Sequence, residues 1–179
     1  TPDPAMTHHR SETMQRLESY LRHWPLNAFT PAKMILAFQA TTLGALRAIT
    51  DAGFVSFASL DSGYFGKALY FTPDYDYSVN VYGMSLLRSW DNAPNSDTQP
   101  VIIAAFVCFR HAFPCTDMSY EGQPSRGGYD THVAVVHHVP PRAMEYQPVD
   151  PTTTADPTYL EIAAFQTAQV LPVAYHLLP

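Results

Sequence analysis

Residues 60–72, LDSGYFGKALYFT, constrain the fold of this chain more than any other stretch. The first half holds Gly63 and Gly66 and has the composition of a turn-rich loop. The second half, 68–72, is apolar and aromatic and stops at a proline, which is typical of a short buried strand. A glycine loop lets the backbone approach a ligand closely. Tyr70 would then lie beside that ligand, although a place in the core is the alternative for its ring.

Hydrophobic periodicity predicts helices early in the chain and strands late, without βαβ alternation, which indicates an α+β fold. Thr42 is predicted to cap the start of a helix that ends before Gly53. Only Gln166 and Thr167 separate the last two strands, which predicts a hairpin, and Pro172 predicts an edge or a bulge there. The predicted helices are 11–24, 42–52 and 74–90, and the predicted strands are 34–38, 68–72, 101–109, 131–139, 159–165 and 168–178.

The composition of the 179 residues fits one folded domain, with 46% hydrophobic and 13% aromatic residues. The net charge of −6, without a dense run of Lys or Arg, argues against nucleic acid or an anionic membrane as the main partner. No apolar run approaches the roughly 20 residues that span a bilayer. Cys108 and Cys115 have no metal-ligand spacing, so we expect reduced, structural thiols and an intracellular location, cytoplasmic or nuclear.

Two further classes of site lack their sequence signals. The eight histidines include no HExxH pattern and no Cys/His pairing at zinc spacing, so we expect no metal. A GxSxG motif is also missing from the sequence, which argues against a serine hydrolase of that type. Residues 1–9 are rich in Pro, Thr and His and are expected to form a linker or disordered end, and the start at Thr1 suggests a domain excised from a longer chain.

Four motifs follow one another between residues 34 and 178. They are FQAT at 38–41, AGF at 52–54, GKALYFT at 66–72, and YLE at 159–161 ahead of QVLP at 169–172. In order and spacing they resemble the catalytic domain of the poly(ADP-ribose) polymerase-like ADP-ribosyltransferases. In that family the corresponding motifs include His-Gly-Thr, Gly-(Lys/Arg)-Gly-(Ile/Leu)-Tyr-Phe and a strand with a catalytic Glu.

The resemblance implies a split β-sandwich of two antiparallel sheets with flanking helices. NAD would lie in the cleft between the sheets, as the co-substrate whose nicotinamide–ribose bond is cleaved before ADP-ribose is transferred. The chain would then consist of a linker or disordered end at 1–9, an N-terminal helix at 10–25 and the ADP-ribosyltransferase catalytic domain at 26–179.

The resemblance also implies roles for the residues at motif positions. Glu161 would be the catalytic residue, Tyr70 would stack on nicotinamide, and Ser78 would bind its carboxamide. Tyr82 would cover the other face of the ring, because Ser78 to Tyr82 follows Tyr70 at close to the family spacing, one residue long, and Tyr75 and Tyr77 are rivals. The implied NAD-binding residues are Gln39, Ala40, Thr41, Tyr70, Ser78 and Tyr82.

The chemistry gives Glu161 an independent rationale. As neutral nicotinamide leaves NAD, positive charge develops on the ribose, and a fixed carboxylate that binds the 2′-hydroxyl stabilises that charge by about 3 kcal/mol or more where water is excluded. Glu161 is the only acid in the apolar run 159–165, where an unpartnered carboxylate is costly. The alternatives are a solvent-facing position for Glu161, helix packing for Tyr82 and a helix cap for Ser78.

Three residues depart from the family pattern. Gln39 replaces His, which in the family holds a hydroxyl of the adenosine ribose, and the Gln amide could do the same because it has both a donor and an acceptor. Ala40 replaces Gly, and its backbone could still serve the carboxamide if its φ is negative. Ala68 replaces the second Gly of its motif. These changes bear on NAD affinity more than on the fold.

The sequence therefore supports three functions. The first is NAD-dependent mono-ADP-ribosylation of a protein acceptor, which the retained Glu161 favours. The second is a weakly active or inactive module that binds NAD or ADP-ribose, which Gln39 and Ala40 favour. The third is an NAD glycohydrolase with water as acceptor, which the sequence does not separate from the first. His132, in the motif GYDTH, is either structural or a neighbour of the acceptor site.

Overall fold

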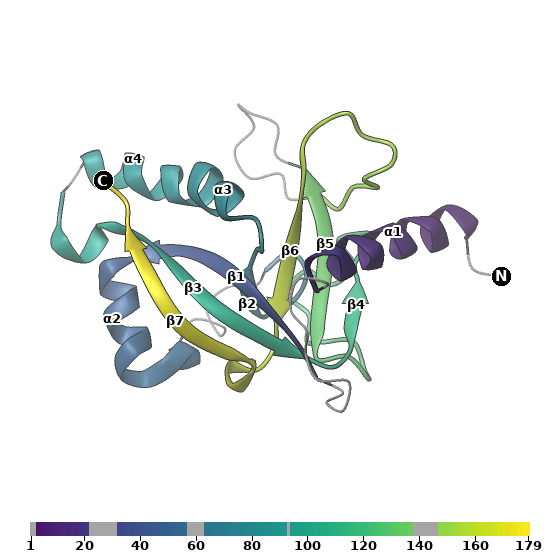
Figure 1. The fold of residues 1–179 in the computed structure, drawn as a ribbon, viewed down its shortest axis with the longest axis horizontal. Coiled ribbons are helices and arrows are strands. Elements are labelled where there is room, and N and C mark those ends of the chain that lie inside the picture. The colour runs from purple at the N-terminus through teal and green to yellow at the C-terminus, as the bar shows by residue number, and fades with distance from the viewer. Residues whose placement is uncertain (1–2, 22–31, 57–62, 93, 138–146) are drawn as a thin grey trace.

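The computed structural model describes residues 3–21, 32–56, 63–92, 94–137 and 147–179. In these residues two sheets form the centre of the fold, and helices lie around them (Figure 1). The elements are α1 (Pro4–Leu21), β1 (Lys33–Thr42), α2 (Leu43–Ala52), η1 (Gly53–Ser56), β2 (Leu69–Phe71), α3 (Tyr75–Tyr77), the π-helical η2 (Ser78–Gly83), α4 (Met84–Asn92), η3 (Ser96–Thr98), β3 (Pro100–Phe109), β4 (Ala112–Pro114), β5 (Thr131–His137), β6 (Thr158–Ala164), η4 (Thr167–Gln169) and β7 (Val170–Leu177).

The predicted α+β class is confirmed. One sheet has the strand order β1-β3-β7 and the other has the order β2-β6-β5-β4. The expectation of purely antiparallel sheets is wrong at one place, because β4 runs parallel to β5. A parallel pair needs a long connection, and the 115–130 segment between these two strands supplies it.

The main core lies between the two sheets. Ile35 and Ile103 from one sheet and Ile162 from the other are at most 1% exposed and belong to one apolar cluster. Helix α2 adds Leu46 and Ile49 to this cluster, and it begins and ends as predicted: the Thr42 hydroxyl accepts a hydrogen bond from the Ala45 N–H (3.3 Å), and Gly53 follows the helix with a φ of 74°. Local cap signals and the apolar stripe therefore suffice to define this helix.

The predicted hairpin of the last two strands is wrong. β6 pairs with β2 and β5, whereas β7 pairs with β3 in the other sheet, so η4 carries the chain from one sheet to the other. The Gln169 amide fixes this corner by donating to the Cys108 carbonyl (3.1 Å) and the Thr131 hydroxyl (3.0 Å). The prediction for Pro172 is confirmed, because β7 is an edge strand whose register against β3 shifts between Ala104 and Ala105.

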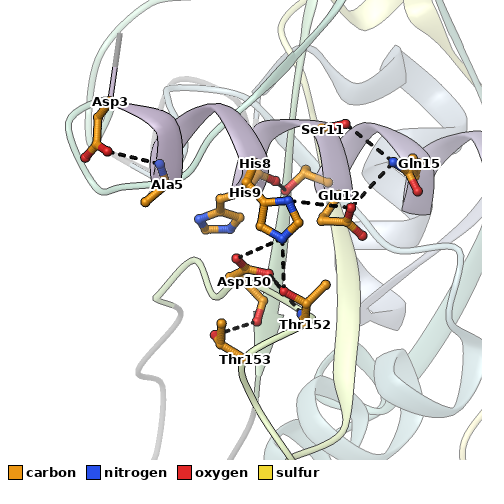
Figure 2. A network of polar contacts seen from close by, with 11 residues as sticks. Asp3, Ala5, His8, His9, Ser11, Glu12, Gln15, Asp150, Thr152 and Thr153 are labelled. Carbon is orange, nitrogen blue, oxygen red and sulfur yellow. Dashed lines mark hydrogen bonds and ion pairs between the residues drawn. The ribbon is translucent and has the colours of Figure 1, made fainter.

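The N-terminal residues form more helix than predicted, so the expected linker at 1–9 is wrong for the described residues from Pro4 onward. Proline suits the first helical position, and the Asp3 carboxylate caps it by accepting from the Ala5 N–H at 3.0 Å. His8 then contacts the hydroxyl of Thr152 (3.2 Å), which ties the start of α1 to the 150–153 turn (Figure 2). The predicted end of this helix, at residue 24 or 25, lies outside the described residues.

Candidate active site

In the described residues the two sheets are joined by a bridge between Phe38 of β1 and Thr72 just after β2. Two backbone hydrogen bonds form it, at 2.7 and 3.0 Å. Continuing its antiparallel register would place Ala40 opposite Tyr70, but no backbone pairing between these two described residues is present, so the strands part after the bridge. A cavity of about 200 Å³ opens at this split. Its described lining residues are Phe38, Gln39, Ala40, Tyr70, Phe71, Thr72, Ser78, Tyr82 and Glu161.

All but one of the residues predicted for the site line this cavity. The exception is Thr41, which is not among the described lining residues because β1 runs on past the cavity to Thr42, the cap of α2. Ligand pockets usually measure about 300–1,000 Å³, so a dinucleotide would extend beyond the described cavity.

Glu161 is buried, with 4% of its surface exposed, so the alternative of a solvent-facing position is wrong. Its Oε1 accepts a hydrogen bond from the Tyr77 hydroxyl at 3.0 Å and another from the Tyr82 hydroxyl. The described lining residues include no Lys, Arg or His. Two of the groups that hold the carboxylate are therefore neutral phenols.

Tyr77, Ser78 and Tyr82 come from one helical run, α3–η2–α4, which agrees with the helix predicted over 74–90. Its middle part is π-helical, a form often found at functional sites, in which one extra residue fits into a turn. Ser78 and Tyr82 both line the cavity. The alternative role for Ser78 was an N-terminal helix cap. This alternative is wrong, because the helix begins three residues earlier, at Tyr75.

Two buried polar atoms of the cavity have no partner among the described residues. They are the Gln39 Oε1 and the Ser78 Oγ, and Ser78 is fully buried. A buried polar atom without a hydrogen bond costs about 1–3 kcal/mol, and proteins satisfy nearly all such atoms. The pair therefore offers two buried polar atoms to a molecule that enters the cavity.

The backbone of Ala40 is also directed at the cavity. In an antiparallel strand the N–H and C=O of one residue point to the same side, and those of the next residue point to the other side. Phe38 uses both groups for its bridge to Thr72, away from β3. Ala40, two residues on, points its N–H and C=O the same way, where the described residues offer no backbone partner.

The glycine loop holds Tyr70 and is not itself part of the described cavity lining. The Tyr70 hydroxyl donates to the Gly66 carbonyl (2.7 Å) and accepts from the Phe65 N–H (2.8 Å). Gly63 has a φ of 51°, and a Cβ there would overlap that hydroxyl. Gly63 is therefore needed because the loop wraps a phenol, whereas the sequence predicted an approach to the ligand itself.

His132 anchors the same loop from the other side. The buried imidazole donates from Nδ1 to the Phe65 carbonyl (2.7 Å) and accepts at Nε2 from the Arg126 N–H (2.9 Å), a pattern that only the neutral ring can satisfy. Burial lowers the pKa of His132 below its usual value. Of the two alternatives for His132, these contacts favour the structural one.

We expect the free energy of unfolding to decrease as the pH falls below about 6.5, the ordinary pKa of histidine. The unfolded chain takes up a proton on His132 near that pH, whereas the folded chain, with its lowered pKa, does so only at lower pH, so acid favours the unfolded state. Urea unfolding at pH 7.5 and 5.5 tests this. The loss should be smaller in His132→Gln, and an equal loss in both proteins would contradict the assignment.

Asp74 supports the strand that carries Glu161, and the sequence reveals it only as a helix start. Its carboxylate makes no cap hydrogen bond and instead accepts from the Leu160 N–H (3.0 Å) and from the Tyr20 hydroxyl. It thus binds the edge of β6 beside Glu161, where β2 has ended. No local pattern signals this role, because its partners lie far away in the sequence.

Comparison of the sequence with known protein families gave no match, and comparison with curated proteins gave none. In the described parts of the chain, no group of His, Cys, Asp and Glu side chains could hold a metal ion, and no helix is long and apolar enough to cross a membrane. Cys108 and Cys115 are both free thiols, as predicted. Function must therefore be inferred from the geometry of the cavity.

Proposed function

We propose that this chain is an NAD-dependent ADP-ribosyltransferase that cleaves the nicotinamide–ribose bond and transfers a single ADP-ribose to a protein acceptor. One observation carries the proposal. The buried Glu161 carboxylate shares a cavity of about 200 Å³ with unpartnered polar groups and two tyrosine rings, at the split between two sheets. The resemblance to the ADP-ribosyltransferases leads one to expect a carboxylate, tyrosines and a serine at such a split.

The polar groups of the cavity suit the carboxamide of nicotinamide. The Ala40 N–H and the Ser78 hydroxyl can donate to its oxygen, and the Ala40 carbonyl can accept from its NH₂ group. Tyr70 and Tyr82 line the same cavity and supply aromatic surface for a pyridine ring. A π-helical turn, such as that in η2, holds one more residue than an α-helical turn. It can therefore accommodate the one residue by which the spacing to Tyr82 exceeds the family spacing.

Glu161 supplies what glycosidic cleavage requires. The bond between the ribose carbon and the pyridinium nitrogen breaks, its electron pair stays on nicotinamide, and positive charge develops on the ribose. A carboxylate that accepts a hydrogen bond from the ribose 2′-hydroxyl stabilises this charge. A nucleophilic side chain of the acceptor then forms a bond to the same carbon and loses its proton.

The second candidate is a binding module of the same fold that turns NAD over slowly or not at all. Gln39 favours it, because the family has His at this position. NAD labelled in the adenylate half, incubated with the protein with and without a cell lysate, separates the candidates. Label on protein supports transfer, free ADP-ribose supports a glycohydrolase, and intact NAD with measurable binding supports the module.

We expect Ser78→Ala to stabilise the protein and to weaken ligand binding. Removing a buried hydroxyl without a described partner should raise the free energy of unfolding by about 1 kcal/mol, whereas losing a donor to the carboxamide should weaken nicotinamide binding about tenfold. Urea unfolding and calorimetric titration measure the two effects. Ser85→Ala, on the exposed side of α4, controls for helix propensity. Unchanged nicotinamide affinity in Ser78→Ala would contradict the role.

A further inference from the structure

Tyr77 reaches the Glu161 carboxylate from behind the cavity. It is 1% exposed and is not among the described cavity-lining residues, yet its hydroxyl donates to the Glu161 Oε1 at 3.0 Å. Tyr82 donates to the same oxygen from within the cavity lining. One carboxylate oxygen is thus held by two phenols that approach it from different elements, α3 and η2.

A second contact fixes Tyr77 against the strand that carries Glu161. Its ring stacks on Tyr159, with ring centres 4.2 Å apart and planes 10° apart. Tyr159 precedes Glu161 by two residues in β6, so the two side chains lie on the same face of the strand. The Tyr82 ring also packs edge-to-face with the Tyr77 ring, with ring centres 5.5 Å apart. Tyr77 therefore binds one strand at two points, which leaves its hydroxyl little freedom.

We propose that Tyr77 is the positioning residue of the Glu161 carboxylate, an inference that rests on the proposed function. A carboxylate that stabilises a developing positive charge is most effective when it is already oriented, because no reorganisation is then needed in the transition state. The Tyr77 phenol supplies that orientation. Since a phenol is neutral, it does so without cancelling the negative charge that the ribose must experience, as a Lys or Arg partner would.

Tyr77→Phe removes the hydroxyl and retains the stacked ring. We expect kcat for NAD cleavage to fall about tenfold, a modest part of the roughly hundredfold that a 1 Å misplacement can cost. KM for NAD and the nicotinamide dissociation constant should stay within about twofold, because the lost contact acts in the transition state. Tyr159→Phe is the matched control, since it retains the same stacked pair and loses a hydroxyl that makes no described contact with Glu161.

A spectroscopic signature separates positioning from folding. The side-chain carboxyl ¹³C resonance of Glu161, assigned with Glu161→Gln, should shift in Tyr77→Phe and stay in place in Tyr159→Phe.

Each outcome bears on one claim. A Glu161 resonance unmoved by Tyr77→Phe, or equal rates in Tyr77→Phe and Tyr159→Phe, overturns the positioning role while the proposed function stands. Wild-type protein that leaves NAD intact contradicts the proposed function and removes the catalytic meaning of the contact.

Discussion

The Glu161→Gln variant is expected to cleave NAD at least about a hundredfold more slowly than the wild type, the loss typical of removing one electrostatic stabiliser. Gln keeps the shape of the side chain and can still accept from a phenol, but it lacks the charge that stabilises the ribose cation. Because that cation exists only near the transition state, nicotinamide affinity should change little. Single-turnover kinetics of NAD loss and calorimetry with nicotinamide measure the two quantities.

Asp76→Asn is the control for net charge, because Asp76 is exposed on the neighbouring α3 and is not among the described lining residues. It should cleave NAD at the wild-type rate. Activity of Glu161→Gln within a few-fold of the wild type would show that Glu161 is not the catalytic residue.

The Gln39→Ala variant is expected to bind NAD more weakly by about 1–3 kcal/mol of binding free energy. This corresponds to a dissociation constant roughly five- to 150-fold higher. The Gln39 Oε1 is buried in the cavity and has no described partner, so a ribose hydroxyl is a suitable donor for it. The loss should be smaller in kcat than in KM, because this end of NAD is remote from the bond that breaks. Titration of NAD into the wild type and the variant measures it.

Gln39→His is the companion variant, since it restores the residue of the family motif. It should retain or increase activity, because imidazole can also serve a ribose hydroxyl. Equal NAD dissociation constants for the wild type and Gln39→Ala would place Gln39 outside the ribose site, and the match of FQAT to the family motif would then have to be abandoned.

Elements with local signals were predictable from the sequence. Helix α2 has its cap at Thr42 and its stop at Gly53, and β3 is an unbroken apolar run that takes the central place in its sheet. The choice of a strand's partner is not local. β6 and β7 are close in sequence, yet β6 needs neighbours on both edges, so η4 carries β7 into the other sheet.

The same limit applies to the site. Glu161 could be singled out because an acid in an apolar strand is costly without a partner. The contact between Glu161 and Tyr77 could not be predicted, because 84 residues separate the two and no periodic pattern links them. The docking of α1 through His8 likewise depends on a contact with Thr152, 144 residues away.

The proposed reaction breaks the nicotinamide–ribose bond of NAD at the cavity that holds Glu161. Chromatographic measurement of free nicotinamide, after incubation of the purified wild type and Glu161→Gln with NAD, tests this reaction. We expect nicotinamide release by the wild type to grow with time and with enzyme concentration, and release by the variant to stay close to that of buffer alone. Intact NAD with the wild type, or equal release by both proteins, would contradict it.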